Sequence, residues 1–382
     1  MERNVFITRV GKFLPNDVVL NDDMEKRLGM IGGRPSRIRP IILRQNRIKK
    51  RYYSINEDGA IRYSNAELMA NAIKGMLDED FTEKDIELLS CGTSTPDQLL
   101  PSHTSMVHGL LKNSLPIPIM SPSGVCCAGA HALQYGYLSV LSGNTSNAVC
   151  GASELVSPLM LAKNYSGEYK ELKKVEANPY IAFDKDFLRW MLSDGAGCVL
   201  LCNKPSDHAL SLKIDWIESV SFANELPTCM YQGVEKGKDG NMVSWKYMDQ
   251  KEWLLKSIFS IKQDIRLLGE NIVAKAVEHI RKSNSKHNLS FHEVNYFLPH
   301  ISSMYFYDRL KDGLEKAGIP CSTEKWFTNL TYVGNVGSAS IYIILDELFH
   351  SGKLKDGDKV YLFIPESGRF SFTTALLTAV KN

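Results

Sequence analysis

The feature that most limits how this chain can fold is its alternation of short β-rich runs with amphipathic helical runs. Strand-like runs occupy residues 4–15, 86–94, 146–155, 197–203, 210–222, 293–300 and 359–367. Helix-like runs occupy residues 65–77, 103–113, 128–143, 265–283, 305–318 and 339–353. Strands that alternate with helices in this way predict an α/β protein with a largely parallel or mixed sheet.

One arrangement occurs twice along the chain, which indicates an internal duplication. Residues 85–111 and 293–314 both contain a strand-like run, then a polar loop, then a helical run. We therefore expect two similar halves, 1–205 and 206–382, packed as one unit. Residues 163–190 and 225–256 interrupt the alternation, and we expect them to cover a pocket or an interface.

Composition and charge exclude several classes of protein. The 382 residues are 44% hydrophobic and carry a formal net charge of +2, which gives no electrostatic case for nucleic-acid binding. There is no signal-like segment and no apolar run approaching ~18 residues, so we expect a cytoplasmic protein without membrane insertion. The eight cysteines form no CxxC pair. We therefore predict no disulfide framework, no metal site and no cofactor.

The stretch "SPSGVCCAGAHALQYG", residues 121–136, contains two adjacent cysteines at the expected start of a helix. Unpaired N–H groups and the helix dipole favour a thiolate at such a place. We therefore predict that Cys127 is a nucleophile, and that Cys126, one residue too early, is turned toward the core as a small apolar filler.

Two polar residues in the second half complete a candidate catalytic set. His300, in "YFLPHISS", follows a hydrophobic strand and could exchange a proton near neutral pH. Asn335, in "VGNVGSAS", lies in a glycine-flanked loop that opens a helix and could donate to a carbonyl or enolate oxygen. Cys, His and Asn suit either a cysteine hydrolase or an acyl transferase that forms carbon–carbon bonds.

Four motifs in order give the chain a resemblance to the ketoacyl synthase III family of the thiolase superfamily. "GVCCAGAHAL" resembles that family's nucleophile motif, "LSDGAGCVLL" its DGAGA stretch, "LPHISS" its PHQAN segment and "VGNVGSASIYIILDEL" its GNTSAAS helix start. A papain-like hydrolase would instead have its cysteine near the start of the mature chain, with a tryptophan nearby.

The resemblance implies a thiolase fold with a duplicated, five-layered αβαβα architecture, usually as a homodimer. It implies that Cys127 takes an acyl group from a CoA or acyl-carrier-protein thioester, and that His300 and Asn335 then promote a Claisen condensation. The backbone N–H of Cys127, with Gly368 or Arg369, would form the oxyanion hole. Leu100 matches a position that reaches across the dimer to the partner's acyl pocket.

Departures from the family pattern concern the substrate. Ser303 stands where the family has an asparagine, and no tryptophan accompanies the basic segment that contains Arg44 and Arg47. We expect these three residues to contact the substrate or its carrier protein. "PESGRFSF" and the 225–256 segment are more similar to the branches that make dialkylresorcinol or cyclohexanedione precursors.

Two further alternatives remain open. One is an enzyme similar to type III polyketide synthases, although these typically have Pro-Gly after the histidine, where this chain has Ile-Ser-Ser. The other is a non-catalytic partner subunit of a synthase heterodimer, although such subunits usually lack one of the three catalytic residues.

Overall fold

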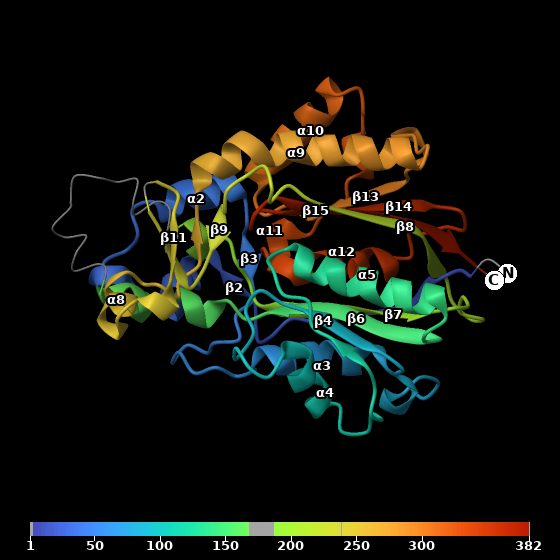
Figure 1. Cartoon of the computed structure of the whole chain (residues 1–382), viewed down its shortest axis with the longest axis horizontal. Helices are drawn as coiled ribbons and strands as arrows, with labels where there is room; N and C mark the ends of the chain where they lie inside the picture. Colours follow the sequence, from blue (N-terminus) through green and yellow to red (C-terminus); the bar gives the residue numbers. More distant parts are fainter. Residues whose placement is uncertain (1–2, 168–186, 238, 382) are drawn as a thin grey trace.

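The protein has five layers, alternately helical and β. The computed structural model describes residues 3–167, 187–237 and 239–381. In Figure 1, α9 and α10 cover one group of strands, α5 and α12 lie in the middle, and α3 and α4 cover the other group of strands. The predicted α/β class and five-layered architecture are therefore confirmed.

Nine strands form a continuous mixed sheet in the order β13-β14-β15-β8-β1-β7-β6-β4-β5. Their bounds are β1 Phe6–Phe13, β4 Leu89–Gly92, β5 Ile119–Met120, β6 Asn147–Glu154, β7 Gly195–Cys202, β8 Ser211–Ser221, β13 Tyr296–Pro299, β14 Lys359–Glu366 and β15 Ser371–Val380. The strands on either side of the β1–β8 contact come from before and after residue 205. The exact boundary between two halves stays a prediction.

The described helices are α1 Met24–Leu28, α2 Arg39–Asn46, α3 Asn65–Met76, α4 His103–Leu110, α5 Cys127–Ser142, α8 Gln250–Leu255, α9 Ile265–Lys286, α10 Met304–Lys316, α11 Leu330–Val333 and α12 Ser340–Phe349. Of these, α3, α4, α5, α9, α10 and α12 agree with the predicted periodic runs of the sequence. No helix among the described residues has the length and apolar character needed to cross a lipid bilayer.

Several elements were absent from the sequence-based expectations, among them α1, α2, α8, α11 and β15. The single buried apolar residue of α2, Ile42, gives that helix little helical periodicity. The central residues of β15 are buried on both faces, so that apolar and polar positions do not alternate.

A sheet face lies above and below the two central helices (Figure 1). Helix α12 is buried on nearly all sides, whereas α5 exposes Tyr135 and Leu138. Small residues allow α5 to approach its neighbours closely. A Cβ built on Gly129 would lie 2.4 Å from the carbonyl oxygen of Ser338, in the short 3-10 helix η10 (Gly337–Ala339). Glycine at this position therefore brings the start of α5 against the loop that carries Asn335.

The segment 225–256 forms a small lobe beside the main sheet. Its strands are β9 (Met230–Tyr231), β10 (Val234–Lys236) and β11 (Met242–Ser244), and α8 follows them. β9 pairs with β12 (Lys262–Gln263), and β2 (Val19–Leu20) pairs with β3 (Lys50–Arg51) nearby (Figure 1). Most of the other predicted excursion, residues 163–190, lies outside the described residues.

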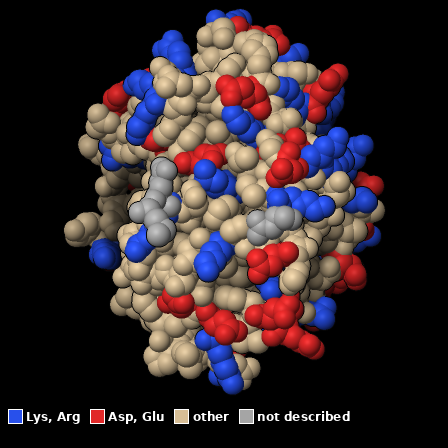
Figure 2. All heavy atoms as spheres, turned by 90° about the vertical axis from the view of Figure 1, so that its right-hand side faces the viewer, with Lys and Arg blue, Asp and Glu red and all other residues tan. Residues whose placement is uncertain are grey.

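Charged side chains of both signs are mixed on the surface. Figure 2 shows acidic and basic groups interspersed over one end of the molecule, without a continuous basic patch on that face. This distribution agrees with the small net charge and gives that face no electrostatic footprint for nucleic acid.

We predict that Gly129→Ala destabilises the fold by about 1–3 kcal/mol, because the added methyl group would force α5 away from η10. Gly269→Ala is the matched control, since Gly269 lies inside α9 and its added methyl group would meet nothing within 4 Å. That change should be neutral or stabilise by up to about 1 kcal/mol. Urea denaturation measures both effects, and equal stability of the two variants would contradict the close contact.

Candidate active site

The carboxyl end of β14 holds the cysteine and the histidine of the predicted site. The backbone N–H of His300 donates to the carbonyl oxygen of Phe363 at 2.8 Å. The Cys127 thiol donates to the carbonyl oxygen of Ile364 at 3.4 Å. Consecutive residues of one strand therefore hold the thiol of Cys127 and the backbone of His300, which are 173 positions apart in the sequence.

Cys127 is the first residue of α5 and is fully buried. Besides the contact with Ile364, its sulfur accepts a weak hydrogen bond from the Thr373 hydroxyl at 3.9 Å. The expectation that this position favours a thiolate is wrong for the protein without substrate. Burial, and then the nearby carboxyl of Glu366, raise the pKa of the Cys127 thiol.

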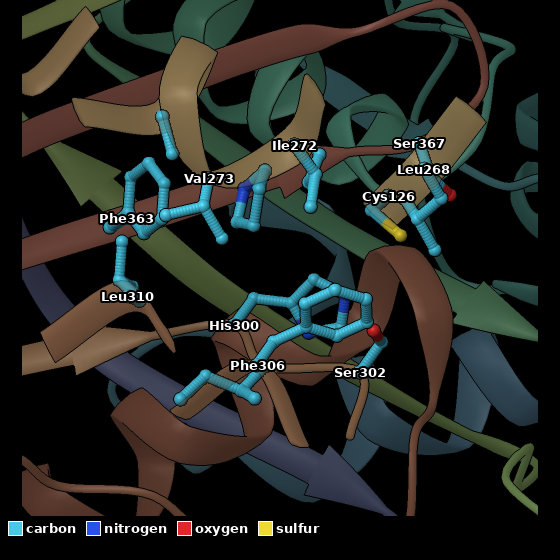
Figure 3. A pocket seen from close by; sticks show the side chains of 13 residues that line it. Cys126, Leu268, Ile272, Val273, His300, Ser302, Phe306, Leu310, Phe363 and Ser367 are labelled. Atoms are coloured by element: carbon cyan, nitrogen blue, oxygen red, sulfur yellow. The ribbon is translucent and has the colours of Figure 1, made fainter. Parts of the chain in front are cut away.

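Cys126 differs from its predicted role as a core filler. Its side chain belongs to the central apolar cluster, but it also lines a pocket together with His300 (Figure 3). Burial raises the pKa of this thiol as well. A sequence pattern could not find this, because both cysteines precede the same small-residue helix.

The pocket beside His300 has apolar walls formed mainly by two helices (Figure 3). Residues from α9 and α10 line it: Leu268, Ile272, Val273, Ala276, Phe306 and Leu310. Polar groups come from Ser302 and Ser367 near its cysteine-bearing side. Such walls suit an aliphatic chain rather than a charged group.

His300 follows β13, as the sequence predicted, and is 2% exposed. Burial lowers its pKa to about 4, so the ring is neutral at pH 7. Its Nε2 atom has no hydrogen-bond partner within the described part of the chain. A buried ring nitrogen without a partner can serve a ligand that enters the pocket.

Asn335 is held by backbone and side-chain contacts between α11 and η10. Its N–H donates to the Met191 carbonyl oxygen at 3.1 Å, and its own carbonyl oxygen accepts from Ser193 at 2.8 Å. Its Oδ1 accepts the N–H of Gly337 at 2.9 Å. The Oδ1 contact therefore stabilises the turn and orients the side-chain amide. Because Oδ1 already accepts a hydrogen bond, Nδ2 is the atom of this amide that can donate to a ligand.

The two predicted oxyanion-hole residues near the carboxyl end of β14 lie in a turn. Gly368 is buried, and a Cβ built on it would lie 2.9 Å from a Val125 methyl group, just before α5. Arg369 is exposed, and its guanidinium donates to the Leu226 carbonyl oxygen at 3.1 Å. The structure thus places Gly368 beside the nucleophile helix, whereas the Arg369 side chain points to another segment.

The remaining predicted residues do not line the His300 pocket. Leu100 is 85% exposed, and Ser303 is a buried helix cap whose Oγ accepts the Tyr305 N–H at 3.3 Å. Arg44 and Arg47 lie exposed on and just after α2, and Arg47 pairs with Asp308 of α10 at 3.7 Å. Their roles toward a substrate or carrier stay predictions.

Two buried carboxyls at the site were not singled out from the sequence. Glu366, in "PESGRFSF", ends β14 and accepts the backbone N–H of Cys127 at 2.9 Å. Glu154 ends β6 and accepts from the side chains of Ser94, Thr95 and Ser338. Burial raises the pKa of both carboxyls. No group of three or more potential metal ligands occurs among the described residues.

Comparisons with known proteins agree with this architecture. Residues 285–370 match a family model described as 3-oxoacyl-[acyl-carrier-protein] synthase III C terminal. The β-ketoacyl-[acyl-carrier-protein] synthase III of Clostridium perfringens is 24% identical over 381 residues, covering 98% of this chain and 99% of that protein.

Solved structures show the same fold over nearly the whole chain. AbyA1, a tetronic acid condensing enzyme, superposes with a TM-score of 0.74 at 17% identity, covering 98% of this chain and 99% of that one. The 3-oxoacyl-[acyl-carrier-protein] synthase III of Aquifex aeolicus gives 0.69 at 21% identity, covering 98% and 99%. The predicted thiolase fold is confirmed.

Within that fold, the resemblance to the ketoacyl synthase III family is also confirmed. The relatives are named as enzymes of the acyltransferase type, which is the class predicted from the sequence. Neither the acyl-cysteine intermediate nor the pathway follows from these likenesses.

We predict that Glu154→Ala lowers the free energy of unfolding by about 3 kcal/mol, because the hydroxyls of Thr95 and Ser338, which are buried, and of Ser94, which is partly buried, lose their acceptor. Glu154→Gln retains one acceptor oxygen and should cost less. Thermal unfolding of the two variants tests this prediction. An unchanged melting temperature for Glu154→Ala would show that the carboxyl does not stabilise the contact between residues 94–95 and η10.

Proposed function

We propose that this chain is a ketoacyl synthase III-like acyltransferase that forms a carbon–carbon bond through an acyl-Cys127 intermediate. Its substrates would be CoA or acyl-carrier-protein thioesters, and the enzyme itself would use no cofactor. The observation that carries the proposal is the position of Cys127 and His300 on consecutive carbonyl groups of β14, with His300 and Cys126, the residue before Cys127, lining an apolar pocket.

The reaction would proceed in two stages. In the first, the Cys127 sulfur attacks the thioester carbonyl carbon, and the CoA or carrier thiol departs. In the second, a carbanion or enolate derived from another thioester attacks the acyl group on Cys127. The β-ketoacyl product then leaves, and the thiol is restored.

His300 and Asn335 would act in the second stage. The neutral imidazole can donate an N–H to the forming enolate oxygen, and its unpartnered nitrogen is available for such a contact. The Nδ2 group of Asn335 is a second donor whose orientation is fixed by the Oδ1 contact with Gly337. The Asn335 donor is already oriented before substrate binds, which limits the reorganisation needed at reaction.

The apolar pocket supports an aliphatic acyl chain on the substrate. Its α9 and α10 walls would hold such a chain, and Ser302 and Ser367 lie where the more polar thioester end would be. A fatty-acid, polyketide or resorcinol-type lipid pathway would use substrates of this kind. Joining two β-ketoacyl thioesters into a dialkylresorcinol or cyclohexanedione precursor is the branch that we favour from "PESGRFSF".

A homodimer is part of the proposal. Leu99 and Leu100 are 76% and 85% exposed at the tip of a loop, which is unusual for adjacent large apolar residues. A second copy of the chain would cover them and receive Leu100 in its acyl pocket.

Arg44 and Arg47 lie exposed on and just after α2, where they would meet the acidic surface or phosphate of a carrier protein.

We predict that Cys127→Ala abolishes formation of an acyl-enzyme, because the attacking sulfur is removed, whereas Cys126→Ala still becomes acylated. Intact-protein mass spectrometry after incubation with acyl-CoA gives the measurement, and peptide mapping locates the acyl group. Acylation of Cys127→Ala would refute the assignment. A wild-type protein that accepts no acyl group would instead favour a non-catalytic partner subunit.

His300→Ala should retain acylation but lose condensation by about a hundredfold or more, because one enolate donor is removed. The acyl-enzyme is prepared first and then incubated with malonyl or β-ketoacyl thioesters, and the masses of the products are measured by mass spectrometry. Wild-type condensation rates in His300→Ala would remove its role. If the wild-type protein forms a product with malonyl thioesters but none with β-ketoacyl thioesters, the resorcinol-type branch is excluded.

A further inference from the structure

The carboxyl of Glu366 occupies the start of the nucleophile helix. Its Oε2 accepts the backbone N–H of Cys127 at 2.9 Å and that of Val125 at 3.1 Å. The residue is 8% exposed, and a Cβ built on Gly368 would lie 3.0 Å from its other oxygen. The N–H groups that would stabilise negative charge at this helix start are therefore already bound to a carboxylate.

This arrangement sets the resting state of the nucleophile. A carboxylate next to a thiol disfavours a second negative charge, and it raises the pKa of Cys127 beyond the effect of burial. The free protein thus holds Cys127 as a thiol. Acylation then needs a group that removes the thiol proton as the sulfur attacks.

We propose that Glu366 is the proton acceptor for Cys127 during acylation, an inference that rests on the proposed function. The S–H bond of Cys127 breaks, an O–H bond forms on Glu366, and the electron pair that remains on sulfur attacks the thioester carbonyl carbon. When the bond between that carbon and the departing sulfur breaks, Glu366 returns the proton to the CoA or carrier thiolate. The thiol leaves, and the carboxylate is restored.

The same proton transfer would make the helix donors available to the substrate. A neutral carboxyl accepts hydrogen bonds more weakly than a carboxylate does. The N–H of Cys127 can then turn from Glu366 to the carbonyl oxygen that becomes negative in the tetrahedral intermediate. One carboxyl would thus activate the sulfur and release the oxyanion donor in a single step.

The groups around Glu366 agree with this role. From α5 it faces Cys127 and His131, and the positive form of His131 would favour the carboxylate. From β15 it pairs with Ser371, and the neighbouring strand residue Thr373 contacts the Cys127 sulfur. Burial raises the pKa of the Cys126 thiol, and the carboxyls of Glu366 and of Glu154, at the end of β6, raise it further. On the other side of β14, the backbone N–H of His300 donates a hydrogen bond to the carbonyl oxygen of Phe363.

The test is the rate of Cys127 acylation by an acyl-CoA, measured by quenched-flow and intact-protein mass spectrometry between about pH 5 and 9. Glu366→Gln keeps an oxygen for the α5 N–H groups but cannot take a proton at these pH values. We expect acylation to fall by about a hundredfold at neutral pH. Glu366→Asp should recover part of the rate.

The pH profile separates proton transfer from a purely structural role. Wild-type acylation should fall as pH drops through the raised pKa of Glu366, since the carboxylate is the active form. Glu366→Gln should lack this limb and stay slower than the wild type up to about pH 9, because burial alone keeps the pKa of the Cys127 thiol raised. Glu293→Gln, an exposed carboxyl paired with Lys359, is the control that should match the wild type.

Two results would overturn the inference while leaving the proposed function intact. The first is acylation of Glu366→Gln at the wild-type rate with the wild-type pH profile. The second is faster acylation of Glu366→Gln, which would mean that the carboxylate only competes for the Cys127 N–H. Absence of acylation in the wild type would reject the proposed function itself.

Discussion

The site depends on hydrogen bonds at the carboxyl end of β14. Three neighbouring positions of this strand hold the backbone of His300, the thiol of Cys127 and the first N–H groups of α5. A strand is a stiff support, because its residues are held by neighbouring strands: β14 pairs with β15 along its whole length and with β13 at residues 360–363. A reaction that needs a sulfur and an imidazole at a constant separation benefits from such a rigid support in the sheet.

The central helical layer explains why the site is buried and still has a pocket. α5 and α12 are enclosed by strands above and below, so water is excluded from Cys127, and the pKa of its thiol is raised. The pocket opens instead under the outer helices α9 and α10, where apolar side chains leave room beside His300. A buried cysteine and an apolar pocket at one strand end are compatible with an acyl chain that displaces water when it binds.

Much of the fold and part of the site could be predicted from the sequence. Local patterns placed Cys127 at a helix start and His300 at a strand end, because each position follows from a short run of apolar residues. β15 was missed, since it is buried on both faces and lacks alternation. Glu366 lies within "PESGRFSF" but was not recognised as a neighbour of Cys127. Its contact joins residues 239 positions apart, and no local period encodes such a pairing. The prediction for the thiolate failed because burial raises the pKa of the Cys127 thiol, and because the carboxyl that raises it further comes from the distant strand β14.

The order of strands in the sheet has a consequence for how the protein acquires its structure. β1 lies between β7 and β8, and β8 in turn lies between β1 and β15. Strand β1 therefore pairs with residues 196–202 of β7, and β8, which also pairs with β1, has residues 371–380 as its other partner. With so many contacts between distant segments, folding is expected to be slow compared with that of a helical protein of local contacts. During synthesis the early strands would remain unpaired for a long time, which makes them candidates for protection by chaperones.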